Sequence, residues 1–166
     1  MFDDFTPTER ATITSVSWEG RYCVPNPTLW AGPNIAAFFL WIQEDQMRPP
    51  RSRYQTPAPP TIYSVQVPIS SIREELDSSV SEDWCSPGVI YSYTYAFQNP
   101  PLVNAGTRYW IGMQPVYSRD GTTWLWRIGQ PQNRMSYALV ALEPHTFPSD
   151  QAFSISGMTA PGQNVE

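Results

Sequence analysis

The sequence predicts an all-β protein: a single antiparallel two-sheet β-sandwich, jelly-roll-like, with about eight or nine short strands. Short runs rich in β-branched and aromatic residues alternate with turn-forming residues, as strands and their connections do. One segment alone has a helical pattern, so at most one short helix is expected. The length of 166 residues suits one domain over positions 1–166, and the 14% aromatic content can build a core without a structural metal.

The first third of the chain is expected to hold two strands separated by a loop. Ala11–Trp18 (ATITSVSW) is rich in β-branched residues, but its apolar alternation slips once after Ile13, which predicts a bulge. Gly20 is expected to end this strand. Residues 24–34 contain three prolines and a glycine, as loops do. Ala36–Ile42 is a continuous apolar run, typical of a buried central strand.

The middle of the chain combines a loop, a strand and the helical segment. Residues 47–60 carry five prolines and three arginines, so an exposed loop with polyproline-like stiffness is expected. Thr61–Val67 (TIYSVQV) alternates cleanly and predicts a strand. Ser70–Val80 is the helix-like segment, because Ser71 precedes Glu74 at capping-box spacing. It can support one or two helical turns.

The second half of the chain supplies the remaining strands. In Ile90–Phe97 (IYSYTYAF) an aromatic residue stands at every second position, so a strand with one aromatic face is expected. Asp120-Gly121 predicts a tight hairpin between two strands. The other expected strands are Thr107–Gln114, Thr122–Ile128, Tyr137–Leu142 and Ala152–Ser156.

Charge and hydropathy exclude two classes of partner. All ten basic residues are arginine, the net charge is -5 and the pI is about 4.8. A non-specific nucleic-acid binder needs a basic stripe, so no nucleic-acid partner is expected. The mean hydropathy is -0.37. No apolar run approaches the ~20 residues that a bilayer crossing needs, so no membrane span is expected.

Cys23 and Cys85 are the only cysteines in the sequence. Neither belongs to a CxxC pair, and one histidine cannot complete a four-ligand zinc site with them. A disulfide between them would close a loop of about 62 residues and stabilise the fold by ~4 kcal/mol. The alternative is two separate buried thiols. The disulfide would imply an oxidising compartment or an extracellular particle.

No catalytic residue and no cofactor are predicted. The only histidine, His145, lies in a turn-like stretch, and the motifs of nucleophilic hydrolases, zinc proteases and P-loop proteins are missing from the sequence. Adjacent carboxylates such as Glu74-Glu75 cannot form an acid–base pair in a strand, because neighbouring side chains point to opposite faces. The metal candidate is a calcium site at Asp3 or Asp4, completed by backbone carbonyl oxygens.

The strand tryptophans fall into two groups. Trp18, Trp41 and Trp110 lie in strand centres and are expected in the core. Trp124 and Trp126 are two residues apart and therefore share one strand face. They would form either a flat platform for sugar rings or part of the core.

The loop aromatics and a group of arginines are the other binding candidates. Trp30 and Trp84 lie in loops beside glycine or proline, where an exposed tryptophan usually marks a binding surface. Tyr54 and Tyr117 are secondary candidates. A basic spot on this acidic protein is either solvated or an arm that docks acidic groups of a neighbouring subunit. It consists of Arg48, Arg51 and Arg53.

A series of short motifs runs along the chain: FDDFT (Phe2–Thr6), TITSVSWEGRY (Thr12–Tyr22), FFLWI (Phe38–Ile42), YSYTYAF (Tyr91–Phe97), NAGTRYWIGM (Asn104–Met113), WLWRIG (Trp124–Gly129) and DQAFSISG (Asp150–Gly157). Together they resemble a family of secreted bacterial β-sandwich domains, found in exported proteins that carry C-terminal sorting tails. The resemblance implies a β-sandwich fold and a place outside the cell, and it implies no particular chemistry.

Two functions are expected from these features. The first is a non-catalytic module, extracellular or on the cell surface, that binds a polysaccharide or another surface partner. The second is a structural subunit of a virion or filament, such as a capsid-decorating or tail-associated protein. It is suggested by Met1 directly abutting the domain, without a signal segment or anchor, and by the Pro/Arg loop. In that case the neighbouring subunits would include copies of the same chain.

Overall fold

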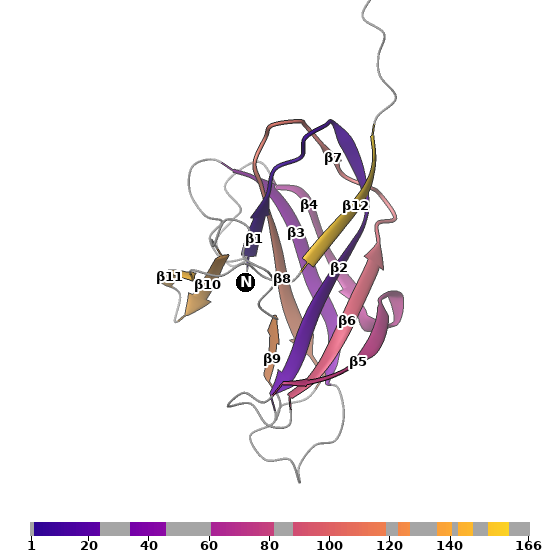
Figure 1. Ribbon diagram of the computed structural model, residues 1–166, viewed down its shortest axis with the longest axis vertical. Helices are drawn as coiled ribbons and strands as arrows, with labels where there is room; N and C mark the ends of the chain where they lie inside the picture. Colours follow the sequence, from indigo (N-terminus) through magenta and orange to yellow (C-terminus); the bar gives the residue numbers. More distant parts are fainter. Residues whose placement is uncertain are drawn as a thin grey trace, which may run out of the picture.

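The computed structural model describes residues 2–23, 34–45, 61–81, 88–118, 123–126, 136–140, 143–147 and 153–159. These residues form twelve strands in two antiparallel sheets that pack face to face (Figure 1). The predicted all-β sandwich is confirmed. It has more strands than expected, because four further segments are strands: Phe2–Phe5, Arg73–Ser81, Leu102–Val103 and the turn-like stretch Glu143–Phe147.

The first sheet, sheet A, contains six strands in the order β11-β10-β1-β8-β3-β4. The predicted central strand is confirmed as β3, which lies between β8 and β4. The strand bounds are β1 Phe2–Phe5, β3 Ile35–Glu44, β4 Thr61–Pro68, β8 Tyr109–Tyr117, β10 Ser136–Val140 and β11 Glu143–Phe147.

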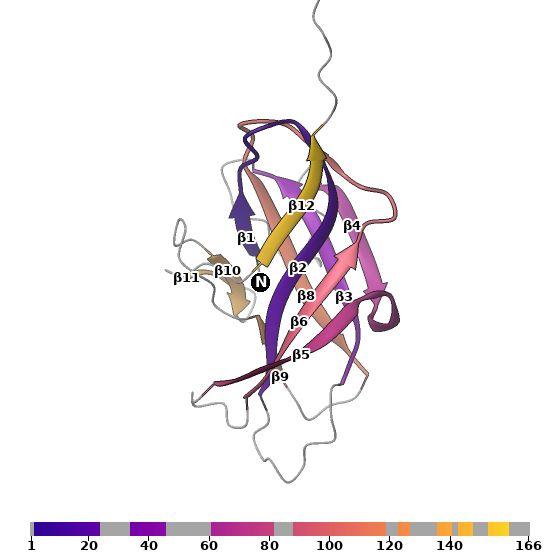
Figure 2. The ribbon, with the colours of Figure 1, turned by 45° about the vertical axis from the view of Figure 1, so that its right-hand side comes forward.

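The second sheet, sheet B, has the order β12-β2-β6-β5 (Figure 2). The short strands β7 and β9 also pair with β2. The long strand β2 therefore organises this sheet, since four other strands pair with it. The strand bounds are β2 Ala11–Cys23, β5 Arg73–Ser81, β6 Gly88–Ala96, β7 Leu102–Val103, β9 Thr123–Trp126 and β12 Phe153–Thr159.

The main core lies between the sheets and is built largely of aromatic rings. Trp18 stacks on Tyr93 with ring centroids 5.5 Å apart, and Phe38 of sheet A packs edge-on against Trp18 at 5.2 Å. Offset stacking and edge-to-face contacts are the arrangements that aromatic rings prefer. The expected aromatic face of Ile90–Phe97 is confirmed, because Tyr93, Tyr95 and Phe97 are all buried in this core.

The predicted bulge in β2 is also confirmed. Ser156 of β12 pairs with Ser15, while the next residue, Gly157, pairs with Ile13. Thr14 is thus the extra residue on β2. It lets both Ile13 and Val16 face the core, although they are three positions apart.

The prediction that Gly20 ends this strand is wrong. β2 continues to Cys23, and Gly20 pairs with Tyr91 on one side and Trp126 on the other. A Cβ atom on Gly20 would overlap the indole ring of Trp124. Gly20 therefore does not end the strand. It is the position at which the Trp124 ring packs directly on the backbone of β2.

The helix predicted within Ser70–Val80 is replaced by a three-residue 3-10 turn at Ile69–Ser71 and by strand β5. Arg73 and Glu75, two residues apart, form an ion pair, as neighbours on one strand face can. Glu74 lies opposite Tyr93 in the register with β6. Pairing with a neighbouring strand thus overrides the local helical pattern.

The hairpin predicted at Asp120-Gly121 is wrong as well. Residues 119–122 themselves lie outside the described part, but the strands on either side of them belong to different sheets. β8 pairs with β1 and β3, whereas β9 pairs with β2. β8 and β9 therefore do not pair with each other as the two strands of a hairpin would.

Candidate functional site

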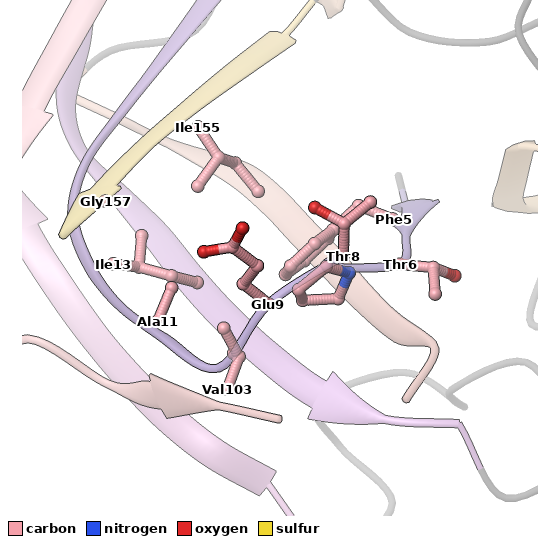
Figure 3. Close-up of a pocket in the computed structure, with 10 residues that line it drawn as sticks. Phe5, Thr6, Thr8, Glu9, Ala11, Ile13, Val103, Ile155 and Gly157 are labelled. Atoms are coloured by element: carbon pink, nitrogen blue, oxygen red, sulfur yellow. The ribbon is translucent and has the colours of Figure 1, made fainter. Parts of the chain in front are cut away.

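A pocket lies at the edge of the sandwich, where the β1–β2 connection faces β12, β2 and β7 (Figure 3). We call it the edge pocket. Its volume is about 510 Å³, a size typical of sites for small ligands. The residues that line it are Phe5, Thr6, Pro7, Thr8, Glu9, Ala11, Ile13, Val103, Ile155 and Gly157.

The floor of the edge pocket is apolar because it is the rim of the main core. Ile13 and Val103 are buried core residues, and Phe5, Ala11 and Ile155 are partly buried against the same core. An apolar group that entered the pocket would therefore continue the packing of the sandwich. Such burial is favourable at roughly 25 cal/mol per Å².

Glu9 supplies the charge in this pocket. The residue is exposed, and Figure 3 shows its carboxylate extending toward the side chains of Ile13 and Ile155. Thr6 and Thr8 add hydroxyl groups to the lining. A carboxylate beside an apolar floor suits a ligand that combines an apolar group with a cation or a hydrogen-bond donor.

Backbone hydrogen bonds hold the rim of the edge pocket in place. The Gly106 N–H donates to the Pro7 carbonyl oxygen at 2.9 Å, which ties the β1–β2 connection to the turn before β8. Gly106 has a φ of 69°, a left-handed conformation that glycine adopts without strain. The Ile13 N–H donates to the Pro101 carbonyl oxygen at 2.9 Å, beside β7.

A second polar group, the Arg108 cluster, joins β1, the end of β3 and the start of β8. The Arg108 Nε lies 2.7 Å from Asp4 Oδ2 and 3.7 Å from Asp45 Oδ2. The guanidinium also lies over the Trp110 ring, 4.7 Å from its centroid. The Trp110 indole N–H donates to Asp45 Oδ1 at 3.1 Å. One cation thus holds three strands of sheet A together.

The Arg108 cluster lies beside a small aromatic cluster away from the main core. Trp41 and Trp110 are buried as expected, but they pack with Phe39 and form their own group. They alternate along β3 and β8 with residues of the main core, such as Ile42 and Ile111. They therefore occupy the opposite face of sheet A.

A third polar group lies inside the sandwich, where Glu74 faces the tyrosines of β2 and β6. Burial raises the pKa values of Tyr22, Tyr91 and Tyr93, and the charge of Glu74 adds to this effect. Burial also raises the pKa of Glu74 itself. The hydrogen bond with Tyr93 lowers this pKa in part, and the net effect is an increase. The tyrosines therefore stay protonated at neutral pH.

Trp124 and Trp126 belong to the core and do not form an exposed platform. Their exposed fractions are 5% and 4%. Trp124 packs edge-on against Phe38 at 5.1 Å and against Tyr93 at 6.1 Å. Trp126 packs edge-on against Phe153 of β12 at 6.1 Å. Of their two expected roles, the structure places them in the packing role.

Tyr117 is exposed at 39%, but its hydroxyl already has a partner. The backbone N–H of Trp124 donates to this oxygen at 2.9 Å, so Tyr117 links the end of β8 to β9. Burial raises the pKa of the Tyr117 hydroxyl, while the hydrogen bond from Trp124 lowers it in part. Tyr117 thus has a structural role, and its exposed ring edge stays a predicted contact.

The remaining predicted contact residues lie outside the described part of the chain, and so does one end of the predicted disulfide. Cys23 is the last residue of β2, whereas Cys85 is not among the described residues. The disulfide therefore stays a prediction. The predicted contact residues outside the described part are Trp30, Arg48, Arg51, Arg53, Tyr54 and Trp84.

Asp3 and Asp4 do not share a site. Asp3 is 1% exposed and accepts a hydrogen bond from the Asp4 N–H at 2.9 Å, while Asp4 pairs with Arg108. As neighbours in β1 they face opposite sides of sheet A. Within the described ranges, no three His, Cys, Asp or Glu residues gather in a way that could hold a metal ion.

The edge pocket was not foreseen from the sequence, although all of its residues are ordinary strand and turn residues. Phe5 and Glu9 flank a short connection, whereas Val103 and Ile155 come from far along the chain. No local motif marks this combination. A weak signal was available in the Thr-Pro-Thr-Glu connection, since it places one carboxylate between Phe5 and the apolar residues Ala11 and Ile13.

Comparisons with models of known protein families, with characterised proteins and with solved structures find no match to this chain. Across the described ranges, no helix has the length and apolar character needed to cross a membrane.

Proposed function

We propose that the chain is a non-catalytic β-sandwich module that acts outside the cell or at a surface and binds a carbohydrate or another surface partner. The observation that carries this proposal is the edge pocket. Its floor is apolar, and its polar groups are the Glu9 carboxylate and the hydroxyls of Thr6 and Thr8. An apolar floor with a few polar groups is typical of a ligand-binding site.

The resemblance of the sequence motifs to secreted β-sandwich domains supports the extracellular setting of this proposal. The low charged fraction of 15% supports it as well, because a surface of Ser, Thr, Gln and Tyr suits polar, uncharged partners. The loop tryptophans Trp30 and Trp84 remain proposed contacts for such a partner.

The proposal can be tested with a panel of immobilised polysaccharides and a panel of extended peptides. Binding to one panel is expected, and it should weaken in Thr8→Trp, which places a large side chain at the edge pocket, or in Trp84→Ala. Both variants should unfold at the parent's temperature. A chain that binds neither panel would refute the module function.

A virion or filament subunit is the second candidate, and one observation favours it. β12 pairs only with β2 among the described strands, and it presents Met158 with 66% exposure. An uncharged strand at a sheet edge can pair with a neighbouring copy. A strictly monomeric mass at millimolar concentration, measured by light scattering, would remove this candidate.

A further inference from the structure

Among the described strands, β12 has an outer side without the usual protection of a sheet edge. In the described part of the chain, β12 pairs with β2 and with no other strand. Phe153–Thr159 contains no charged residue and no proline. Natural edge strands usually carry such residues, or bulges, which prevent pairing with another chain. The bulge in this sheet puts its extra residue, Thr14, on β2 and leaves β12 regular.

The edge pocket lies beside this strand. Two residues of β12, Ile155 and Gly157, contribute to its lining, and Phe5 and Glu9 face them from the β1–β2 connection (Figure 3). A strand added to β12 would direct every second side chain toward the core side of the sheet. Those side chains would meet the apolar floor of the pocket. Strand addition of this kind takes its affinity from backbone hydrogen bonds and its specificity from such pockets.

The charge of the pocket defines the kind of segment it would accept. Glu9 places a carboxylate at the apolar floor, and the chain as a whole carries a net charge of -5. A segment with a lysine or arginine would therefore be attracted to this edge, and an acidic segment would be repelled. A second copy of this chain, with its net charge of -5, is attracted to this edge less than a basic partner is.

We propose that β12 and the edge pocket together bind an extended polypeptide segment of another protein, in which apolar side chains alternate with polar ones and one basic side chain pairs with Glu9. This inference rests on the proposed binding function and names its partner class. It assigns the partner as a protein rather than a polysaccharide.

The test is selection from a phage-displayed library of random seven-residue peptides, followed by synthesis of the enriched peptides. Enriched peptides are expected to contain lysine or arginine beside alternating apolar residues. Their binding should weaken roughly tenfold in Glu9→Gln and more in Glu9→Lys, since tenfold corresponds to one charge pair of moderate strength. Glu75→Gln is the matched control, because Glu75 is exposed on β5 at the other edge of sheet B.

Hydrogen exchange of the β12 amides tests the strand addition itself. Bound peptide should slow exchange in Phe153–Thr159 and leave the other sheet edge, β5, unchanged. Peptide binding that is insensitive to Glu9→Lys, or that leaves exchange in β12 unchanged, would overturn the inference. An empty selection would overturn it too.

A parallel panel of polysaccharides separates this inference from the function on which it rests. Polysaccharide binding without peptide binding would sustain the binding module and overturn the peptide groove. Failure of both panels would refute the module function together with this inference. Peptide binding that depends on Glu9 and protects β12 would support both.

Discussion

Gly20 decides how Trp124 is buried, because the indole ring lies where a side chain on residue 20 would stand. Gly20→Ala should destabilise the protein by about 1–3 kcal/mol, since the ring must move out of a packed core. Urea unfolding followed by tryptophan fluorescence measures this loss. The matched control is the same change in a Trp124→Ala background, where Gly20→Ala should cost much less. Equal losses in both backgrounds would show that the ring contact is not the cause.

Arg108 is the cation that β1, β3 and β8 share. The Asp4 side chain is 5% exposed, so removing its cation leaves a nearly buried carboxylate poorly compensated. Arg108→Met should therefore lower the free energy of unfolding by about 1–3 kcal/mol. Arg108→Lys should lose less, because it keeps the charge but not the planar stacking on Trp110. Thermal unfolding compares the two, and a Met variant as stable as the parent would contradict this role.

Glu74 predicts a pH dependence of stability. Burial raises its pKa above the ordinary value of 4.5, so the folded protein keeps the proton to higher pH than the unfolded chain does. Above pH 4.5 the contribution of Glu74 to the free energy of unfolding accordingly falls, until the pH passes the folded-state pKa. Glu74→Gln abolishes this titration. Urea unfolding from about pH 4 to 8 should show that the free energy of unfolding of the variant increases relative to that of the parent as the pH rises. A difference that does not change with pH would contradict this prediction.

At the scale of the strand, Thr14 is an insertion that the sheet accommodates as a bulge. Deleting Thr14 leaves Ile13 and Val16 on the same face, because they then stand two positions apart. The deletion loses the hydrogen bonds of Thr14 to Phe97 and Ser156, at a cost of about 1–3 kcal/mol.

Ser17 offers the matched deletion in the same strand. Removing Ser17 makes Val16 and Trp18 neighbours, and neighbouring side chains of a strand point to opposite faces of the sheet. One of the two must therefore leave the core. Differential scanning calorimetry should therefore find a cooperative transition for the Thr14 deletion and none for the Ser17 deletion. The same outcome for both would mean that the bulge does not set the register.

Strands with strict alternation were predictable from the sequence, and strands fixed by distant partners were not. β4 and β6 show period-two patterns because one face of each packs against the core. β5 is charged and carries a helical pattern, and its pairing with β6 determines its conformation. The course of β2 past Gly20 depends on Trp124, about a hundred residues away, which local patterns do not reveal.

The candidate site was harder to predict than the fold. Trp124 and Trp126 share a strand face with or without an opposing sheet, so spacing alone could not decide between a platform and a core. The edge pocket depends on how β1, β7 and β12 meet at one end of the sandwich. Such a meeting is a property of topology, and it leaves no mark in any single segment.

The whole molecule is dominated by pairings between distant parts of the chain. β1 pairs with β10, and β12 pairs with β2, so both sheets join the two ends of the sequence. Sandwiches of this kind fold on a timescale of milliseconds to seconds, because long loops must close before the strands can pair. Stopped-flow tryptophan fluorescence after dilution from urea should show this range. Folding in microseconds would mean that contacts between residues close in sequence, rather than pairing of distant strands, set the folding rate.

The position of β1 has a consequence for the protein while it is being made. Phe2 lies between Gly112 of β8 and Tyr137 of β10, so among the described strands β10 and β11 join sheet A through this four-residue strand alone. At synthesis rates of about 5–20 residues per second, Phe2 leaves the ribosome roughly 7–30 s before Tyr137, its partner in β10. During that interval, the side of β1 that later pairs with β10 has no partner strand. β1 is therefore a segment of the nascent chain that a chaperone could protect until β10 has been made.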